Sequence, residues 1–423
     1  MKLEERIIEV LKEPVCDNCL GRTMGNLVSG MSNAQRGRAA RDYVAFLIDS
    51  GEKLNVHAPN FRSYRLRNAK LQTDGPTRCE VCGDFFSEGL EAMVKRAAAK
   101  VSGYEFSDFV VGSSPTDEMQ NKEEALWNRI GIDYIEPIKS EINREAGKRL
   151  EKLTGKKFNM KDPDIVFFFD LKRDEVLLQV KSLYISGGYQ KLVRGIPQTR
   201  WVCMDCNGKG CVECKGEGKR YKTSVHEIVG KPAAKAADGK DHAFHGAGRE
   251  DIDARCLDYR PFVIEVIKPK KRRIDLKKLE RAINKSGKVR VGRLAFCDKE
   301  TVVKTKSDRH DKTYTAEVEF EDKIDKKLLP KIKSLKGATV MQRTPNRVAH
   351  RRADLIRKRG VLSIVFKQTG PKKLRVTVKG QAGLYIKELM SGDEGRTTPS
   401  VAVLLNNKVK KIVLDVVKIH PVI

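Results

Sequence analysis

The sequence predicts an α+β fold, with a compact α/β module in its N-terminal part and mainly antiparallel strands with helices to one side in its C-terminal half. Three observations predict this. The chain has 423 residues, too many for one hydrophobic core, so two or three domains are expected. Helical and strand-like segments are mixed up to about Arg194. From Thr223 onward, strand-like segments predominate.

The N-terminal part combines helices with strands. An amphipathic helix is expected in "MKLEERIIEVLKEP", and further helices over about 34–50, 91–101 and 122–154, the last broken near Gly131 and Pro137. Strands are expected in "YEFSDFVVGSS", "DPDIVFFFDL" and "EVLLQVKSLYISGG", the last two forming a hairpin. This order predicts a module that ends near Arg194.

The C-terminal half has fewer helices, expected over 275–285 and 322–335. The stretches "GVLSIVFKQTG" and "KLRVTVKGQAGLYIKEL" are predicted to pair as a hairpin across "GPKK". The final segment "VAVLLNNKVKKIVLDVVKI" indicates a helix or strand followed by a last strand.

The charge of the chain points to a polyanionic partner. Lysine and arginine total 84 against 56 acids, which gives a net charge of +28. Neutralised phosphates release condensed counterions, so nucleic acid is the leading interpretation; the alternative is a solvated basic surface, as in some heat-adapted proteins. No apolar run reaches the roughly 18 residues of a membrane helix, and the N-terminus lacks a secretory pattern. We expect a cytoplasmic protein that does not bind membranes.

Eight of the ten cysteines fall in four Cys-x-x-Cys pairs. Reduced cysteines at this spacing favour metal binding over disulfides, and two pairs complete a tetrahedral zinc site. The alternatives are unrelated reduced pairs at the first site, and partial occupancy or loss of the metal at the second. The expected zinc ligands are Cys16, Cys19, Cys79 and Cys82 in one site and Cys203, Cys206, Cys211 and Cys214 in the other.

Acids are concentrated in the loop "HGAGREDIDAR", just before the strand-like stretch 262–266. A carboxylate that acts as a nucleophile must be ionised and rigidly held, and a loop beside a strand with Arg249 nearby provides both. Lys387 in "GLYIKEL" is a second candidate cation. Tyr314, at the start of an alternating strand, is the best aromatic wall for a flipped base. The alternative is a turn rich in solvated acids.

These stretches resemble known active-site segments. "GREDIDAR" looks like the aspartate loop of pseudouridine synthases, "KTYTAEVEF" like their tyrosine-bearing strand, and "GLYIKEL" like the segment that carries their basic residue. Through "CDNCLGR", "RGIPQTRW" and "SGDEGRTTPS" the chain is similar, almost end to end, to the Pus-ten family of archaeal and eukaryotic tRNA pseudouridine synthases.

The resemblance implies a domain order: a four-cysteine zinc module over 1–83, a THUMP-like RNA-binding domain over 84–200, and a catalytic domain over 201–423. The last would have the pseudouridine synthase fold, with a mixed or antiparallel sheet. The implied activity is conversion of uridine to pseudouridine at positions 54 and 55 of the tRNA TΨC arm, with structural zinc and no catalytic cofactor.

The resemblance also assigns roles to residues. Asp251 matches the catalytic aspartate, with Asp253 as the competing acid. Tyr314 matches the tyrosine that stacks on the flipped uracil and is a candidate to remove its C5 proton. Lys387 matches the basic partner of the aspartate, where the wider superfamily more often has arginine.

RNA contacts are expected from a basic stretch, "HRRADLIRKR". Its alternative is a solvated face. The predicted substrate-binding residues are Arg249, Arg351, Arg352, Arg357 and Tyr385. In the THUMP-like region, the candidates are Lys181, Lys191 and Arg194.

Two other functions compete with this one. The first is a non-catalytic zinc-containing tRNA-binding protein. The second is another THUMP-domain tRNA-modifying enzyme, although the chain lacks both the PP-loop of a thiolase and the glycine-rich nucleotide loop of a methyltransferase. The expected partner is tRNA, and the expected state is a monomer.

Overall fold

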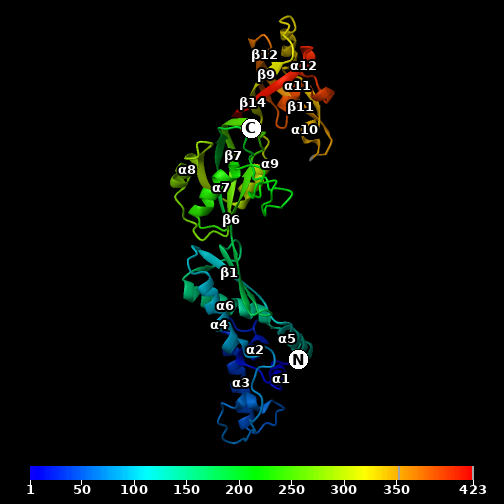
Figure 1. Ribbon diagram of the computed structural model, residues 1–423. Helices are drawn as coiled ribbons and strands as arrows, with labels where there is room; N and C mark the ends of the chain where they lie inside the picture. Colours follow the sequence, from blue (N-terminus) through cyan, green and yellow to red (C-terminus); the bar gives the residue numbers. More distant parts are fainter. Residues whose placement is uncertain (351–352, 422–423) are drawn as a thin grey trace. The chain divides into compact units, whose positions relative to one another are not determined.

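The computed structural model describes residues 1–350 and 353–421, and the chain divides into two compact units, Met1–Lys181 and Ser182–Ile423 (Figure 1). This division lies ahead of residue 200, the expected end of the THUMP-like region. The single strand expected over residues 175–188 is divided in the structure: residues 175–180 pair within the first unit, and residues 183–191 form a separate strand that pairs within the sheet of the second unit.

Helices form a large part of the first unit. Ser32 caps the helix that begins at Asn33 by accepting from Gln35 N, and Thr116 caps the helix that begins at Asp117 by accepting from Met119 N. Gly155, at a φ of 67°, ends the helix over Ile138–Thr154. The helices are α1 (Leu3–Val10), α2 (Asp17–Arg22), α3 (Asn33–Asp49), η1 (Ala58–Phe61), η2 (Phe85–Gly89), α4 (Leu90–Lys100), α5 (Asp117–Ile130) and α6 (Ile138–Thr154).

A four-stranded sheet completes this unit. Its strands are β1 (Asp108–Ser114), β2 (Lys157–Phe158), β3 (Ile165–Asp170) and β4 (Glu175–Val180), in the order β2-β1-β3-β4. β1 is parallel to β2 and β3, and β3 forms an antiparallel hairpin with β4, as expected. The buried rings of Phe109 and Phe167 meet edge to face with centroids 5.5 Å apart. The first unit is therefore an α/β module, as predicted.

The second unit is built on one ten-stranded sheet. Its order is β13-β10-β11-β12-β9-β14-β7-β5-β8, with β6 paired to β7. The strands are β5 (Leu183–Lys191), β6 (Asp241–Gly246), β7 (Arg255–Ile267), β8 (Val289–Cys297), β9 (Lys312–Phe320), β10 (Thr339–Arg343), β11 (Ile356–Gly370), β12 (Lys373–Gly380), β13 (Thr397–Thr398) and β14 (Val409–Ile419).

One short parallel pairing joins the two parts of this sheet. β14 pairs with β7 in parallel through Asp415–Arg255 and Val416–Cys256, and the other pairings of the described strands are antiparallel. Asp415 also forms ion pairs with Arg255 at 2.7 Å and Arg194 at 2.6 Å, which hold the junction. The predicted α+β class with a mixed, mainly antiparallel sheet is confirmed, and the junction brings the loop before β7 close to β9.

Short helices accompany this sheet. They are α7 (Val225–Ala236), α8 (Leu276–Asn284), α9 (Lys299–Ser307), η3 (Leu329–Leu335), α10 (Asn346–Ala349), α11 (Ile386–Ser391), η4 (Asp393–Gly395) and α12 (Val401–Leu404). No helix in 1–350 or 353–421 combines the length and apolar character needed to cross a membrane.

Two expected elements of the second unit are wrong. The helix expected over 322–335 is only the 3-10 helix η3, because Pro330 has no backbone N–H to donate within a longer helix. The expected strand through "GLYIKEL" ends at Gly380. A turn with Gly383 at a φ of 90° follows, and Lys387 lies on α11 instead. The predicted hairpin of β11 and β12 is confirmed.

Candidate active site

A buried lysine holds the acidic loop between β6 and β7. Lys191 on β5 is fully buried, and its Nζ donates to the carbonyl oxygens of Ile196 (2.9 Å), Asp251 (2.9 Å) and Ile252 (3.1 Å). All three ammonium hydrogens are thus used by backbone carbonyls, two in this loop and one at Ile196. Lys191 cannot contact tRNA, so that prediction is wrong. It instead fixes the backbone that carries Asp251.

The first acid of the loop is structural. The side chains of Glu250 and Arg260 are each 1% exposed and lie 3.1 Å apart, from Oε2 to Nε. Tyr189 donates its hydroxyl to Glu250 at 3.0 Å, and burial raises the pKa of Tyr189 well above its usual value. Arg260 also donates to the Ala247 carbonyl at 3.0 Å. Glu250 therefore compensates a buried cation and is not available to a substrate.

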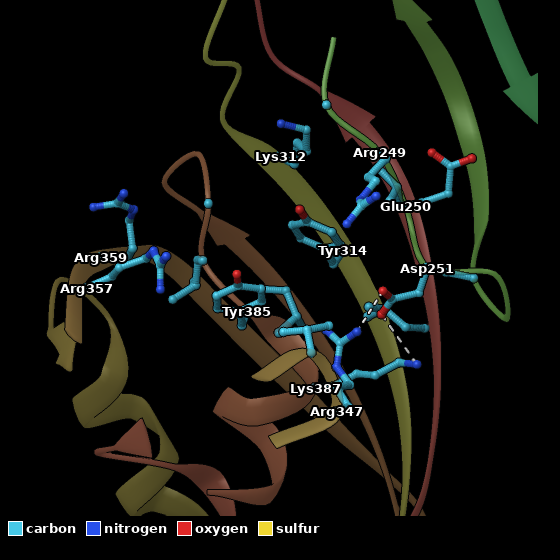
Figure 2. A pocket seen from close by; sticks show the side chains of 18 residues that line it. Arg249, Glu250, Asp251, Lys312, Tyr314, Arg347, Arg357, Arg359, Tyr385 and Lys387 are labelled. Carbon is cyan, nitrogen blue, oxygen red and sulfur yellow. Dashed lines mark hydrogen bonds and ion pairs between the residues drawn. The ribbon is translucent and has the colours of Figure 1, made fainter. Parts of the chain in front are cut away.

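Asp251 faces a cavity and contacts two cations. Its Oδ1 accepts from Arg347 Nη1 at 2.8 Å, and its Oδ2 lies 3.5 Å from Lys387 Nζ. Figure 2 shows both cations on one side of the Asp251 carboxylate. The side chain of Asp251 is 28% exposed, so a ligand can reach it.

Arg347 is the tighter partner of Asp251 and was not predicted. It lies on α10, and its Nε donates to Glu388 Oε1 at 2.7 Å while its Nη1 reaches Asp251. Burial opposes the charge of Arg347, but these contacts outweigh it and raise the pKa of Arg347 above its usual value. The sequence signal was weak, because Arg347 is one of several basic residues in "QRTPNRVAHRR" and no spacing relates it to Asp251.

Lys387 binds the competing acid more closely than it binds Asp251. Its Nζ lies 2.8 and 2.7 Å from the two carboxylate oxygens of Asp253. Partial burial opposes the ionisation of Asp253, but the hydrogen bond and charge of Lys387 outweigh it and lower the pKa of that carboxyl. Lys387 therefore bridges both acids. The expected pairing with Asp251 is present at 3.5 Å, as the longer of its two contacts.

The cavity beside Asp251 has a volume of about 340 Å³ and two aromatic residues in its wall. Tyr314 on β9 and Tyr385 at the start of α11 both line it, and Figure 2 shows both rings. Burial raises the pKa of Tyr314 to about 12, so its phenol stays protonated at neutral pH. The backbone of Tyr385 is held by the buried Gln342, which donates to its carbonyl at 2.9 Å and accepts from its N–H at 2.8 Å.

Basic residues also line the cavity. Arg249, Arg357, Arg359 and Lys312 all line it (Figure 2). Arg357 lies on β11, not on a separate helix or loop, and donates to Thr344 Oγ1 at 2.9 Å. The predicted contacts Arg351 and Arg352 lie outside the described residues. The predicted residues Asp251, Tyr314, Lys387, Arg249, Tyr385 and Arg357 thus share one cavity.

Sequence comparison identifies the family. A profile described as "Pus10, C-terminal" matches residues 184–420, and one described as "Pus10 THUMP domain, archaeal" matches residues 93–170. The chain belongs to the Pus10 family. A Pus10 relative from Methanothrix thermoacetophila is 42% identical over 417 residues, covering 96% of this chain and 92% of the relative. One from Methanocaldococcus jannaschii is 40% identical over 431 residues, covering 97% and 93%. Both relatives are named "tRNA pseudouridine synthase Pus10".

Solved structures add little to the Pus10 assignment. A Cbf5–Nop10–Gar1 complex aligns with a TM-score of 0.29 and 14% identity, covering 55% of this chain and 48% of the matched chain. A resemblance at that score supports no conclusion about this protein.

Outside the cavity, the chain carries two four-cysteine clusters. In the first unit, the Sγ atoms of Cys16, Cys19, Cys79 and Cys82 all lie within 4.8 Å of one another. Cys16 and Cys82 are 3.6 Å apart, close to the roughly 3.8 Å that zinc–sulfur bonds of about 2.3 Å impose in a tetrahedron. The buried Arg22 donates to Cys19 Sγ at 3.2 Å, which suits a thiolate ligand. Four thiolates in this arrangement fit a structural zinc ion.

The second cluster closes a glycine-rich loop of the second unit. The Sγ atoms of Cys203 and Cys211, and those of Cys206 and Cys214, are 3.8 Å apart in each pair. All four lie within 4.8 Å of one another. Backbone N–H groups of Gly210 and Gly218 donate to Cys206 and Cys214 at 3.2 and 3.1 Å. Both predicted ligand sets can therefore hold a metal ion.

Proposed function

We propose that this protein is a tRNA pseudouridine synthase that isomerises uridine at positions 54 and 55 of the TΨC arm. The observation that carries the proposal is the cavity in which the carboxylate of Asp251 faces the same space as Tyr314 and contacts both Arg347 and Lys387. Membership of the Pus10 family, and the names of the relatives, support the same reaction.

The reaction is an isomerisation and needs no redox partner. The target uridine flips out of the RNA into the cavity, at a cost of roughly a few kcal/mol. Asp251 helps to break the N1–C1′ bond, either by attacking the sugar or by promoting a glycal intermediate. The uracil turns, C5 bonds to C1′, C5 loses its proton and N1 gains one. The two cations keep the carboxylate in place throughout.

Tyr314 acts mainly as a wall for the flipped base. Burial raises the pKa of its phenol to about 12, so at neutral pH the hydroxyl carries its proton and the anion that would remove the C5 proton is rare. The aromatic ring provides a stacking surface whatever the state of the hydroxyl. Tyr314 would accept the C5 proton only by passing its own proton to another group.

The partner that these features support is tRNA, with the region matched as a THUMP domain (93–170) holding part of it. The zinc ions are proposed to be structural, since each cluster supplies four cysteines and leaves no coordination position for a substrate. The chemistry is assigned to side chains of the second unit alone.

The test compares Asp251→Asn with Asp253→Asn. The amide introduced at position 251 keeps the shape of the side chain but cannot act as a nucleophile, so pseudouridine formation in a tRNA transcript should fall at least about 1000-fold. The Asp253 variant should lose less than about tenfold, because its carboxylate only positions Lys387. Both variants should bind tRNA like the parent, and transcripts with cytidine at position 54 or 55 identify which uridines react.

Two results would contradict the proposal. If the parent binds tRNA but forms no pseudouridine without added cofactors, the protein is a zinc-containing tRNA-binding protein. If Asp253→Asn abolishes the reaction while Asp251→Asn does not, the catalytic acid has been assigned to the wrong residue.

A further inference from the structure

A second cavity lies beside the catalytic one. It has a volume of about 230 Å³. Its own lining residues are Pro197, Gln198, Thr199, Trp201, Ile252 and Asp253, and it shares Arg249, Glu250, Asp251, Arg347 and Lys387 with the catalytic cavity. The loop that carries Asp251 thus lines two cavities. The reaction described above uses only the one with Tyr314 and Tyr385.

We infer that this second cavity binds the nucleotide next to the reacting uridine, with its base against the indole of Trp201. The inference rests on the proposed function, because it needs an RNA strand with one uridine in the catalytic cavity. An RNA chain that places one base beside Tyr314 must continue past Asp251. The adjoining cavity with an aromatic residue is the nearest place for the next base.

The composition of the second cavity fits a nucleotide. Trp201 offers an aromatic surface, which accepts any base. Thr199 adds a hydroxyl group. Gln198 Nε2 donates to Tyr189 Oη at 2.7 Å and Gly248 O at 2.8 Å, so this side chain is a fixed part of the cavity wall. Protein side chains of these types recognise unpaired bases by stacking and edge hydrogen bonds.

The shared residues suit the phosphate between two nucleotides. Three of them, Arg249, Arg347 and Lys387, are cations that line both cavities. A phosphodiester that joins a base in one cavity to a base in the other must pass these side chains. Arginine and lysine are the usual partners of phosphate oxygens. The linking phosphate would thereby fix the sugar of the reacting uridine relative to Asp251.

Trp201 is held in place at the base of the second cysteine loop. Its carbonyl accepts from Arg220 N at 3.0 Å, and the next residue, Val202, forms a β-bridge with Lys219. Its indole meets the ring of Tyr221 edge to face, with centroids 5.7 Å apart and planes at 85°. Such an anchored ring loses little freedom when a base stacks on it.

The test is a cycle that combines a protein change with an RNA change. Trp201→Ala should raise the KM for tRNA about 10- to 100-fold, the range for loss of one base stack, while Trp201→Phe keeps most of the affinity. A transcript with an abasic residue on one side of the target uridine, 5′ or 3′, should show a similar loss with the parent protein. On that transcript, Trp201→Ala should cause no further loss.

The inference would be overturned if the losses of activity caused by Trp201→Ala and by the abasic residue were independent of each other. If Trp201→Ala and the abasic residue each weaken the reaction and their effects multiply, the indole only supports the loop. If neither abasic position, 5′ or 3′, affects the reaction, the cavity does not hold the neighbouring base. Trp201→Phe guards against misfolding, since it retains an aromatic ring at the base of the cysteine loop.

A binding readout separates this inference from the proposed function. The chain has two tryptophans, so Trp127→Phe leaves Trp201 as its only indole. In that background with Asp251→Asn, intact tRNA should quench the Trp201 fluorescence and the abasic transcript should not. If quenching follows this pattern but the protein with Asp251 intact forms no pseudouridine, the proposed function fails and the nucleotide site stands. Equal quenching by both transcripts contradicts the nucleotide site.

Discussion

Arg347 and Lys387 show how individual residues control the candidate nucleophile. Each cation contacts Asp251 and also a second acid: Arg347 binds Glu388, and Lys387 binds Asp253. Because every cation is shared between two acids, its position is fixed before any substrate arrives. The two shared cations therefore hold the carboxylate of Asp251 in a fixed position.

Replacing Arg347 should slow the chemical step more than it weakens binding. In Arg347→Met, Asp251 loses a hydrogen bond of 2.8 Å and Glu388, whose side chain is 4% exposed, loses its partner. We expect kcat for pseudouridine formation to fall about 10- to 100-fold, with a smaller rise in KM from the lost contact to the linking phosphate. Arg347→Lys should recover part of the loss, since it keeps the charge but not both hydrogen bonds.

The matched control is Arg343→Met. Arg343 pairs with the exposed Asp354 and lies on the neighbouring strand β10. Its variant should keep kcat within about twofold of the parent. Equal losses in both variants would mean that Arg347 only stabilises the fold.

Lys312 should make stability depend on pH. Burial, with a smaller contribution from the charge of Arg260, lowers the pKa of Lys312 to about 8 from its usual value of 10.5. Between these values the folded protein binds fewer protons than the unfolded chain, so stability rises as the pH rises from about 8 towards 10. The free energy of unfolding of the parent should increase relative to Lys312→Met by about 1–3 kcal/mol over that window.

Denaturant unfolding of the second unit at about pH 7 and about pH 10 measures this difference. Lys373→Met, at an exposed position of β12, serves as the control and should show a constant difference from the parent. A constant difference for Lys312→Met as well would mean that the Lys312 ammonium is not penalised by burial.

At the scale of elements, the first cysteine cluster connects parts of the chain that lie between helices and contain little secondary structure. Cys16 caps α2, and its cluster joins that helix to Cys79 and Cys82 just before η2. Residues 62–84 between η1 and η2 contain no helix or strand. Cys19 and Cys82 also belong to the hydrophobic core of the first unit, so a metal ion there connects the loop to the core.

Removing the metal should therefore destabilise the first unit. We expect two zinc ions per chain by elemental analysis. Cys19→Ser, or a chelator, should lower the thermal midpoint of the first unit by roughly 10 °C or more, because a structural zinc contributes several kcal/mol. Cys297→Ser is the control, because Cys297 belongs to neither cluster. An unchanged midpoint in Cys19→Ser, or a chain without bound metal, would contradict the prediction.

At the scale of the whole molecule, the net charge of +28 sets how the protein meets its substrate. A field of that sign attracts any polyanion, whatever its sequence, and accelerates encounter. Selectivity for particular uridines must then come from short-range features such as the two cavities that Asp251 lines. Affinity and selectivity thus have different physical origins in this protein.

Binding of tRNA should accordingly depend steeply on salt. The affinity should fall at least about 100-fold between roughly 50 and 200 mM salt, as phosphate contacts lose their counterion-release advantage. Arg357→Ala should reduce the slope of log affinity against log salt by about one, equally for tRNAs of different sequence. Arg375→Ala is the comparison, since Arg375 is paired with Glu317. A salt-independent affinity would exclude phosphate contacts as the main source of binding.

Local patterns in the sequence were enough to predict the cysteine clusters and one β-hairpin of this protein. The Cys-x-x-Cys spacing predicted two groups of thiols that the structure brings together, because two residues between cysteines allow both thiols to face one point. The strand pattern predicted the hairpin of β11 and β12, since a short turn leaves adjacent strands few other partners. The residue patterns indicated Tyr314 and Lys387, and the resemblance to a known family selected Asp251 among the loop acids; all three line one cavity.

Tertiary structure decided what surrounds those residues. Arg347 and Asp251 are separated by 96 positions and meet only because β14 pairs in parallel with β7 beside β9. The sequence predicted Lys191 to be an exposed cation, but in the folded sheet it is buried against the Asp251 loop. Pairing between strands that are distant in the sequence depends on the packing of the whole unit, so it cannot be predicted from residue spacing within a short segment. The composition and motifs thus determine the chemistry available to this chain, and the packing determines which groups act together.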